Sequence, residues 1–201
     1  PAAAVAAFNA VYGQLPGELA PKLALAAACE AAGEPAVAER LYTTCARTDA
    51  AFVATGQFGL ARIAAQAGDR DAALHALDRI PATGRAYGDA RRSRALLRAA
   101  ALDPAHALQD LGQAANELEQ ASLQPVERAS LRIRLLESAL VHVQAQGPQM
   151  AQEVGGVPAA ELPLRRALES AYRDAARLAT DGDRRVELVD KANAVRPRTL
   201  V

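Results

Sequence analysis

The most constraining feature of this 201-residue chain is a segment that recurs in altered form 35 residues later. The first copy spans residues 33–46 and the second spans residues 68–81. The matched pairs that lie 35 positions apart are Gly33 and Gly68, Ala38 and Ala73, Tyr42 and Leu77, and Cys45 and Ile80. Ala107, Leu111 and Ala114 continue the pattern another 34 residues on. A fixed spacing of this kind is typical of stacked copies of one small structural unit.

The length of the period selects among the known repeat architectures. About 34 residues with a helix, a tight turn and a second helix is the pattern of tetratricopeptide repeats. Ankyrin repeats, at about 33 residues, need a Thr-Pro-Leu-His-like turn, which this chain lacks. Aromatic residues are only 3% of the chain, which favours alanine-packed helix pairs over sheets. We therefore predict an all-α tetratricopeptide helical-hairpin solenoid with about ten helices.

Proline and glycine divide the helical pattern into segments. Pro16 and Gly17 end a first helix expected over about 3–14. Residues 1–17 are therefore predicted to be an entry helix and linker from an upstream domain, and residues 18–201 a solenoid with C-terminal capping helices. The chain begins without an initiator methionine and inside a helical pattern, so we expect a fragment of a longer protein.

The C-terminal part contains one weak segment followed by a cap. Glycines and prolines predict a loop or a weak helix over residues 147–158. Two further helices, at about 160–180 and 184–195, are expected to cap the array, because an internal repeat would expose its stacking surface. The polar outer face expected on this cap consists of Arg165, Arg166, Glu169, Arg173, Asp174 and Arg177.

The third repeat is less regular than the first two. Its first helix is expected over residues 87–101. The inward side chains that we expect there are Leu96, Leu97 and Ala100. Strict counting of the repeat would instead place Arg94 and Arg98 inside, and burying a charge is costly. We therefore predict that this helix has slipped in register.

Charge and cysteine content exclude several classes of protein. Lysine plus arginine and aspartate plus glutamate number 23 each, so the basic footprint of a nucleic-acid-binding domain is absent. No apolar run approaches the roughly 18 residues that span a bilayer, and the N-terminal stretch lacks the basic region of a signal peptide. Cys29 and Cys45 fall at core positions; a disulfide or metal pair is the alternative, but two cysteines do not complete a four-ligand site. We expect reduced thiols and a cytoplasmic location.

No constellation of catalytic residues is present in the sequence. A protein kinase needs a glycine-rich phosphate loop and the His-Arg-Asp and Asp-Phe-Gly motifs, and none occurs. His75, His106 and His142 stand alone in three predicted helices, which does not make a metal site. We therefore expect no catalytic residue, no metal and no cofactor in this chain.

One cluster of arginines stands out from the balanced charge. Arg91, Arg94 and Arg98 share one face of a predicted helix, at positions i, i+3 and i+7. Guanidinium groups bind carboxylates and phosphates with paired hydrogen bonds. These three residues are the candidate partner-binding site for an acidic or phosphorylated protein; the alternative is a solvated face that pairs with neighbouring acids.

Four segments carry a resemblance to a known family. Residues 8–26 read Phe-Asn-Ala-Val-Tyr-Gly-Gln-Leu-Pro-Gly-Glu-Leu-Ala-Pro-Lys-Leu-Ala-Leu-Ala, and residues 188–201 read Leu-Val-Asp-Lys-Ala-Asn-Ala-Val-Arg-Pro-Arg-Thr-Leu-Val. With residues 58–62 and 77–81 they resemble the C-terminal tetratricopeptide repeat domain of actinobacterial PknG-type soluble serine/threonine protein kinases. The segment Leu-Pro-Gly-Glu-Leu-Ala-Pro-Lys within 8–26 is the most specific part of this resemblance.

The resemblance implies a regulatory role without catalysis. In that family a regulatory region, often with a rubredoxin-like metal module, precedes a kinase domain and a C-terminal repeat array. The array is linked to substrate selection, contact with the kinase domain and dimerisation, and the kinase acts on forkhead-associated-domain regulators. The resemblance carries no catalytic or metal-binding residue onto this chain. The alternative function is a free-standing tetratricopeptide adaptor or co-chaperone-like scaffold.

Overall fold

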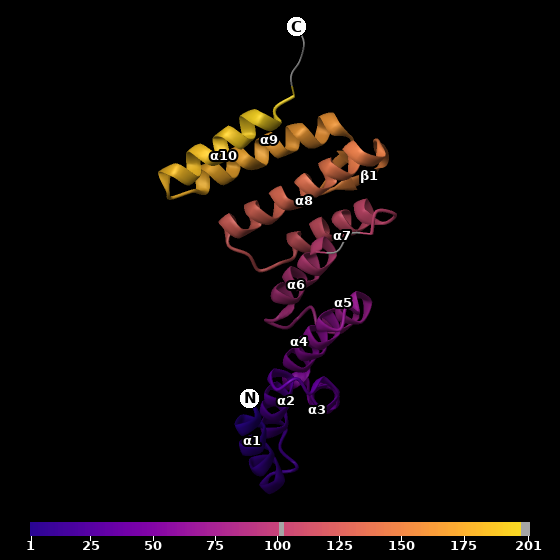
Figure 1. Ribbon diagram of the computed structural model, residues 1–201, viewed down its shortest axis with the longest axis vertical. Helices are drawn as coiled ribbons and strands as arrows, with labels where there is room; N and C mark the ends of the chain where they lie inside the picture. The colour runs from indigo at the N-terminus through magenta and orange to yellow at the C-terminus, as the bar shows by residue number, and fades with distance from the viewer. Residues whose placement is uncertain (101–102, 198–201) are drawn as a thin grey trace. The chain divides into compact units, whose positions relative to one another are not determined.

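The computed structural model of the chain describes residues 1–100 and 103–197. These residues form ten helices and one two-stranded sheet, which confirms the prediction of an all-α chain with about ten helices (Figure 1). The helices belong to two compact units, Pro1–Ala90 and Arg91–Val201. Ala101, the expected end of a helix, and the closing residues 198–201 lie outside the described residues.

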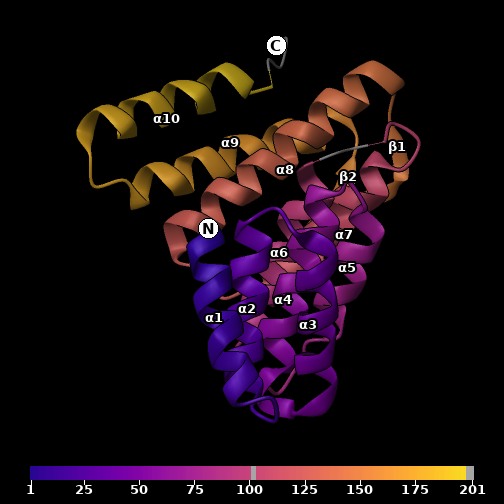
Figure 2. The same ribbon diagram turned by 60° about the horizontal axis from the view of Figure 1, so that its bottom comes forward.

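The first unit consists of five helices that pack as consecutive neighbours, as Figure 2 shows. Their bounds are α1 Ala2–Gln14, α2 Leu19–Ala31, α3 Pro35–Thr48, α4 Ala50–Gln66 and α5 Arg70–Asp78. Pro35 begins α3, where its missing N–H would have had no helical partner. Asp69 caps α5, because its carboxylate accepts a hydrogen bond of 2.9 Å from the backbone N–H of Ala72.

The two matched glycines of the repeat end their helices in the same conformation. Gly33 follows α2 and Gly68 follows α4, each with a φ of +79°. L side chains rarely adopt this left-handed conformation, so glycine suits the position. In both turns the next residue's N–H donates to the carbonyl oxygen five positions earlier, at 2.9 Å. The period in the sequence therefore corresponds to a repeated helix–turn–helix unit.

The core of the first unit closes around Tyr42 of α3, which is 1% exposed. Its hydroxyl donates to Glu30 Oε2 of α2 at 2.7 Å. Arg62 of α4 holds the same carboxylate with two hydrogen bonds of 2.7 and 2.8 Å. Gly59 lies against the tyrosine ring, and a Cβ at this position would stand 2.5 Å from the nearest ring carbon. Tyr42 thus joins three helices through one side chain.

Both cysteines are enclosed in the first unit. Cys29 is 2% exposed and Cys45 is 0% exposed, and both thiols are free. Burial raises the pKa of each thiol, because the thiolate would lose its hydration. The prediction of core packing is confirmed, and the alternative of a disulfide is wrong.

The second unit contains five helices and a hairpin. The helices are α6 Tyr87–Ala100, whose first residues precede the boundary between the units, α7 Ala107–Glu119, α8 Pro125–Gln146, α9 Glu161–Leu178 and α10 Gly182–Val195. The fully buried side chains of its core include Leu111, Leu136, Val154, Leu164 and Leu168. Arg128 of α8 closes the end of α7, since its guanidinium donates to the carbonyl oxygens of Leu118 and Ala121.

The segment after α8 is a β-hairpin, so the prediction of a loop or weak helix over residues 147–158 was wrong. Strand β1, Gln149–Val154, pairs with the antiparallel strand β2, Val157–Ala159. Gly155 and Gly156 connect them with φ values of +59° and +74°, the conformation that two-residue hairpin turns demand. Gly112 of α7 admits this hairpin, since a Cβ there would lie 2.7 Å from the carbonyl oxygen of Glu153.

Candidate partner-binding site

The three candidate arginines of α6 contact acidic side chains of α7. Arg91 Nη1 lies 2.8 Å from Glu117 Oε2, and Arg94 Nε lies 2.6 Å from Glu117 Oε1. Both oxygens of one carboxylate are therefore engaged. Arg98 Nη1 lies 3.6 Å from Asp110 Oδ1. The structure thus brings Arg91, Arg94 and Arg98 together, but against acids of their own unit.

These arginines are more enclosed than the sequence suggested. The side chains of Arg94 and Arg98 are 11% and 16% exposed. The expectation that desolvation keeps them out was wrong, because it omitted the carboxylates that compensate their charge. Of the side chains expected to face inward instead, Leu96 and Leu97 are half-buried and Ala100 is exposed. A residue that was not singled out, Ala95, is the buried one at 3%.

The remaining face of the arginine cluster opens onto a shallow pocket of about 270 Å³. Beside the three arginines, the pocket is lined by Gln113 and Asn116 of α7 and by Gln120, which directly follows α7. An acidic partner at this face would compete with Glu117 and Asp110 for the same guanidinium groups. Partner binding by Arg91, Arg94 and Arg98 stays a prediction.

The histidines do not gather into a site. His106 directly precedes α7, and its Nδ1 lies 2.8 Å from Asp103 Oδ2, on the surface. His142 Nε2 of α8 lies 3.3 Å from the side chain of Gln149. His75 is exposed on α5. In the part of the chain that the structure describes, no group of three or more histidine, cysteine or acidic side chains could hold a metal ion.

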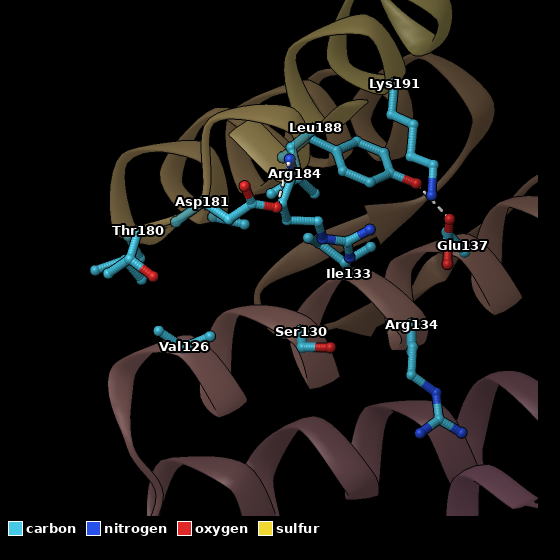
Figure 3. Close-up of a pocket in the computed structure, with 14 residues that line it drawn as sticks. Val126, Ser130, Ile133, Arg134, Glu137, Thr180, Asp181, Arg184, Leu188 and Lys191 are labelled. Atoms are coloured by element: carbon cyan, nitrogen blue, oxygen red, sulfur yellow. Dashed lines mark hydrogen bonds between the residues drawn. The ribbon is translucent and has the colours of Figure 1, made fainter. Parts of the chain in front are cut away.

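A larger cavity, of about 390 Å³, lies between α8, α9 and α10 in the second unit (Figure 3). In the figure, Val126, Ser130 and Arg134 lie along α8, opposite Leu188 and Lys191 of α10. We call this cavity the α8–α10 groove. Ile133 and Leu188 line it as buried apolar residues. Val126 and Leu178 also line it and remain 58% and 38% exposed.

Four polar side chains that line the α8–α10 groove have partners within the second unit. The Tyr172 hydroxyl donates to a carboxylate oxygen of Glu137, and burial followed by this hydrogen bond raises the pKa of Tyr172. Lys191 pairs with Glu187 at 2.8 Å, and Arg184 pairs with the same carboxylate, so the pKa of Glu187 is lowered. Asp181 caps α10. These contacts leave an apolar groove with a charged rim, suited to an apolar side chain of a protein.

The α8–α10 groove was not predicted from the sequence. Val126 and Leu178 are apolar residues that the structure leaves on the surface of their helices. Contiguous exposed apolar side chains with a polar rim are typical of interaction sites. The helical pattern alone did not separate them from core residues.

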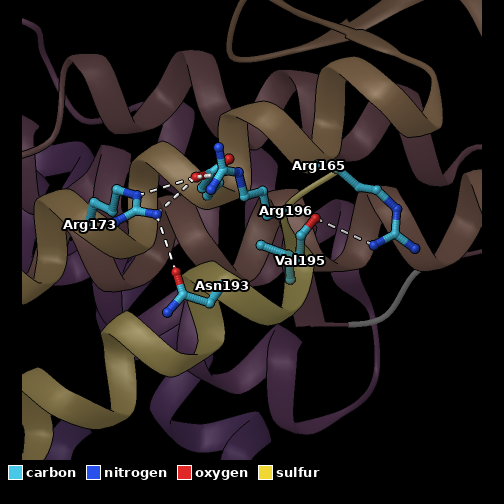
Figure 4. Close-up of polar contacts among 6 residues, drawn as sticks. Arg165, Arg173, Asn193, Val195 and Arg196 are labelled. Carbon is cyan, nitrogen blue, oxygen red and sulfur yellow. Dashed lines mark hydrogen bonds and ion pairs between the residues drawn. The ribbon is translucent and has the colours of Figure 1, made fainter. Parts of the chain in front are cut away.

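The predicted outer face of the cap is partly covered by α10 (Figure 4). Arg173 of α9 donates to Glu169 and to Asn193 of α10, at 3.0 and 3.3 Å. Arg165 donates to the carbonyl oxygen of Val195 at 3.4 Å. Arg166 and Arg177 are exposed, while the other four residues of the predicted face are half-buried. The last helix is therefore held on α9 by polar contacts as well as by its apolar side.

Comparisons with known proteins agree with the repeat architecture. The family model of the protein kinase G tetratricopeptide repeat matches residues 1–199. The chain is 37% identical over 192 residues to the serine/threonine-protein kinase PknG of Mycolicibacterium smegmatis. The matched region covers 94% of this chain and 25% of that protein. It is 36% identical over 202 residues to PknG of Mycobacterium leprae, covering 100% of this chain and 26% of that protein. The tetratricopeptide prediction and the family resemblance are confirmed, and the chain spans about a quarter of the length of these relatives.

Proposed function

Because the chain belongs to the protein kinase G tetratricopeptide repeat family, we propose that it is the non-catalytic interaction and regulatory domain of a serine/threonine protein kinase. Both relatives are named as such kinases, and the chain corresponds to about a quarter of each. This supports a domain within a kinase over the alternative of a free-standing adaptor. We propose in turn that residues 1–17 enter from an upstream domain and that residues 18–201 form the repeat array with its cap.

The observation that carries the proposal is the α8–α10 groove. Its exposed Val126 and Leu178 lie beside buried apolar side chains, and such surfaces usually serve protein contacts. A second group of exposed apolar side chains lies on α1 and the residue that follows it: Phe8, Val11 and Leu15 are 39%, 43% and 50% exposed. These two surfaces fit the roles proposed for the domain, namely substrate selection, contact with the kinase domain and dimerisation.

The partner is proposed from the family rather than from a bound molecule. We propose the kinase domain of the same polypeptide, a forkhead-associated-domain regulator as its substrate, or a second copy of the domain. A cytoplasmic location fits these partners. None of the described helices is long and apolar enough to cross a membrane. A role of Arg91, Arg94 and Arg98 would require the partner to displace Glu117 or Asp110, so we place the groove first.

The proposal is tested in the full-length protein with a charge placed in the groove. Val126→Asp and Leu178→Asp change exposed residues, so folding should be retained. The matched control is Val186→Asp, because Val186 is 62% exposed on α10 and does not line the groove. The measurements are kcat/KM for a protein substrate, kcat/KM for a short peptide substrate, and self-association by sedimentation.

The expected result is a loss of about tenfold in kcat/KM for the protein substrate or in self-association, since a central apolar contact of an interface often contributes that much. Phosphorylation of the short peptide should not change. If both groove variants match Val186→Asp in every measurement, the groove does not serve the proposed function.

A further inference from the structure

We infer that the second unit carries a site for a small organic acid: a pocket between α7, α8 and the hairpin binds a carboxylate whose body is a compact, branched hydrocarbon. This pocket, the hairpin pocket, has a volume of about 130 Å³. It is separate from the α8–α10 groove, since no residue lines both. The inference goes beyond the proposed function and does not depend on it, because it concerns a small molecule and not a protein partner.

The floor of the hairpin pocket is apolar. It is formed by buried side chains of three elements, namely Ala115 and Leu118 of α7, Leu135 and Leu136 of α8, and Val154 of β1. Gly155 in the turn of the hairpin completes the lining. Such side chains offer dispersion contacts to a hydrocarbon but no hydrogen bonds to water. The part of a ligand that reaches the floor is therefore expected to be apolar.

The mouth of the hairpin pocket is charged. Glu119 and Arg132 line the pocket and are exposed, so they lie at its opening, and the half-buried Arg128 lies beside them. Arg128 donates to two backbone carbonyl oxygens at the end of α7. Arg132, one turn further along α8, pairs with no acidic side chain in the part of the chain that the structure describes. Two guanidinium groups and one carboxylate leave the mouth positively charged, which favours a monoanion.

The volume of the pocket and the chemistry of Arg132 together select the ligand. An apolar cavity of about 150 Å³ in another protein admits benzene, so the hairpin pocket, at about 130 Å³, admits a body of about four to six carbon atoms. A guanidinium group binds a carboxylate with two parallel hydrogen bonds. The deaminated acid 4-methylpentanoate and the amino acid leucine share this chemistry. Leucine adds an ammonium group, for which Glu119 is the acceptor at the mouth.

A bound acid contacts α7, α8 and the hairpin at once, because all three line the pocket. Strand β1 contacts both helices, whereas its partner β2 has only three residues. A ligand that binds only the folded state stabilises that state by mass action. The acid should therefore raise the unfolding temperature of the second unit and hold the hairpin on the two helices.

The first test titrates the full-length protein with 4-methylpentanoate by calorimetry and compares it with acetate and with the neutral 4-methylpentan-1-ol. The branched acid should bind about tenfold more tightly than either, because acetate lacks the hydrocarbon body and the alcohol lacks the charge. Leucine is titrated in parallel. If leucine binds more tightly than 4-methylpentanoate, the free amino acid is the ligand and Glu119→Gln should abolish the difference; if it binds more weakly, the deaminated acid is the ligand.

The second test places the ligand with Arg132→Gln and its matched control Arg134→Gln, which changes an exposed arginine of the same helix outside the pocket. Both changes are on the surface, so the unfolding temperatures without ligand should match wild type. Arg132→Gln should weaken 4-methylpentanoate about tenfold and leave the alcohol unchanged, while Arg134→Gln should change neither.

Three results would overturn the inference. The first is no binding of either acid at about 10 mM, since a site that fits the ligand should bind more tightly. The second is equal affinity of wild type and Arg132→Gln for the acid that binds. The third is an equal loss in both variants, which would mean attraction to the general charge of α8.

Discussion

Each unit contains one buried tyrosine that donates to a glutamate, and the two pairs differ in what surrounds them. In the first unit, Tyr42 and Glu30 are completed by Arg62, which holds the carboxylate with two hydrogen bonds. In the second unit, Tyr172 donates to Glu137, and the pair borders the α8–α10 groove. Glu137 is exposed, whereas the side chain of Glu30 is only 12% exposed.

The difference shows how one arrangement can stabilise a fold or leave a surface for a partner. A guanidinium from a third helix and a glycine against the ring close the first pair. The second pair joins α8 to α9, and open space remains on its other side, where α10 supplies the opposite wall. Where three helices close completely around the tyrosine, it contributes to stability; where a cavity remains beside it, it also lines the groove that we propose as a binding surface.

The largest effect is expected from removing the closed tyrosine. Tyr42→Ala should lower the free energy of unfolding by about 3–5 kcal/mol, because the tightly packed surroundings cannot fill the cavity. Tyr172→Ala should lower it by less, about 2–4 kcal/mol, because the vacated space joins a cavity that already exists. Chemical denaturation of the two variants gives the order, and a larger loss for Tyr172→Ala would contradict the comparison.

The close packing of the ring is tested by adding one methyl group. Gly59→Ala should destabilise the first unit by about 1–3 kcal/mol, since the new Cβ would meet the ring of Tyr42 at 2.5 Å. Gly182→Ala at the start of α10 is the control, because no atom lies within 4 Å of a Cβ there. Thermal unfolding should show a loss for the first variant only. Equal unfolding temperatures would mean that the ring moves aside at little cost.

Variants of the α6 arginines distinguish a stabilising role from a binding role. Arg94→Ala should cost about 1–2 kcal/mol of unfolding free energy, because it removes one of two arginines from the buried carboxylate of Glu117. Arg92→Ala is the control: Arg92 is 45% exposed and pairs with Glu127, so its loss should cost at most about 1 kcal/mol. If Arg94→Ala is as mild as the control and partner binding falls, the predicted binding role gains support instead.

A pH-dependent effect is expected from the titration of Tyr42. Burial, and then the bond to Glu30, raise the pKa of its hydroxyl from 10.0 to about 12. A raised pKa in the folded state means that the contribution is fully present below the ordinary pKa and is lost as the pH rises through the raised one. The free energy of unfolding should therefore fall between pH 10 and 12, and Tyr42→Phe should fall less steeply. Denaturation at several pH values measures both slopes; identical slopes would contradict the assignment.

The repeat and its turns could be predicted because they depend on local sequence. Gly33 and Gly68 each follow a helix that ends with a residue in the left-handed conformation. Their 35-residue spacing shows that this helix end occurs once in each repeat. Cys29 and Cys45 followed from their places on the apolar faces of two helices. These features need no knowledge of which helix packs against which.

The features that the sequence did not predict depend on contacts between elements. The burial of Arg94 on α6 is favourable only because Glu117 of α7, 23 residues later in the chain, accepts a hydrogen bond from it. The hairpin was missed although Gly155 and Gly156 favour a two-residue turn, because Gly112 of α7 completes the place into which it fits. The α8–α10 groove depends on three helices at once. Periodicity describes one helix at a time and cannot supply these partners.

The enclosure of both cysteines in the first unit gives the chain a built-in reporter of local opening. A thiol reagent reacts with the thiolate, which burial disfavours, so labelling has to wait until that unit opens. The second unit has no cysteine and therefore does not react with the thiol reagent. The labelling rate of the unmodified protein therefore follows the opening of one half of the molecule alone, and a ligand that slows it must act on that half.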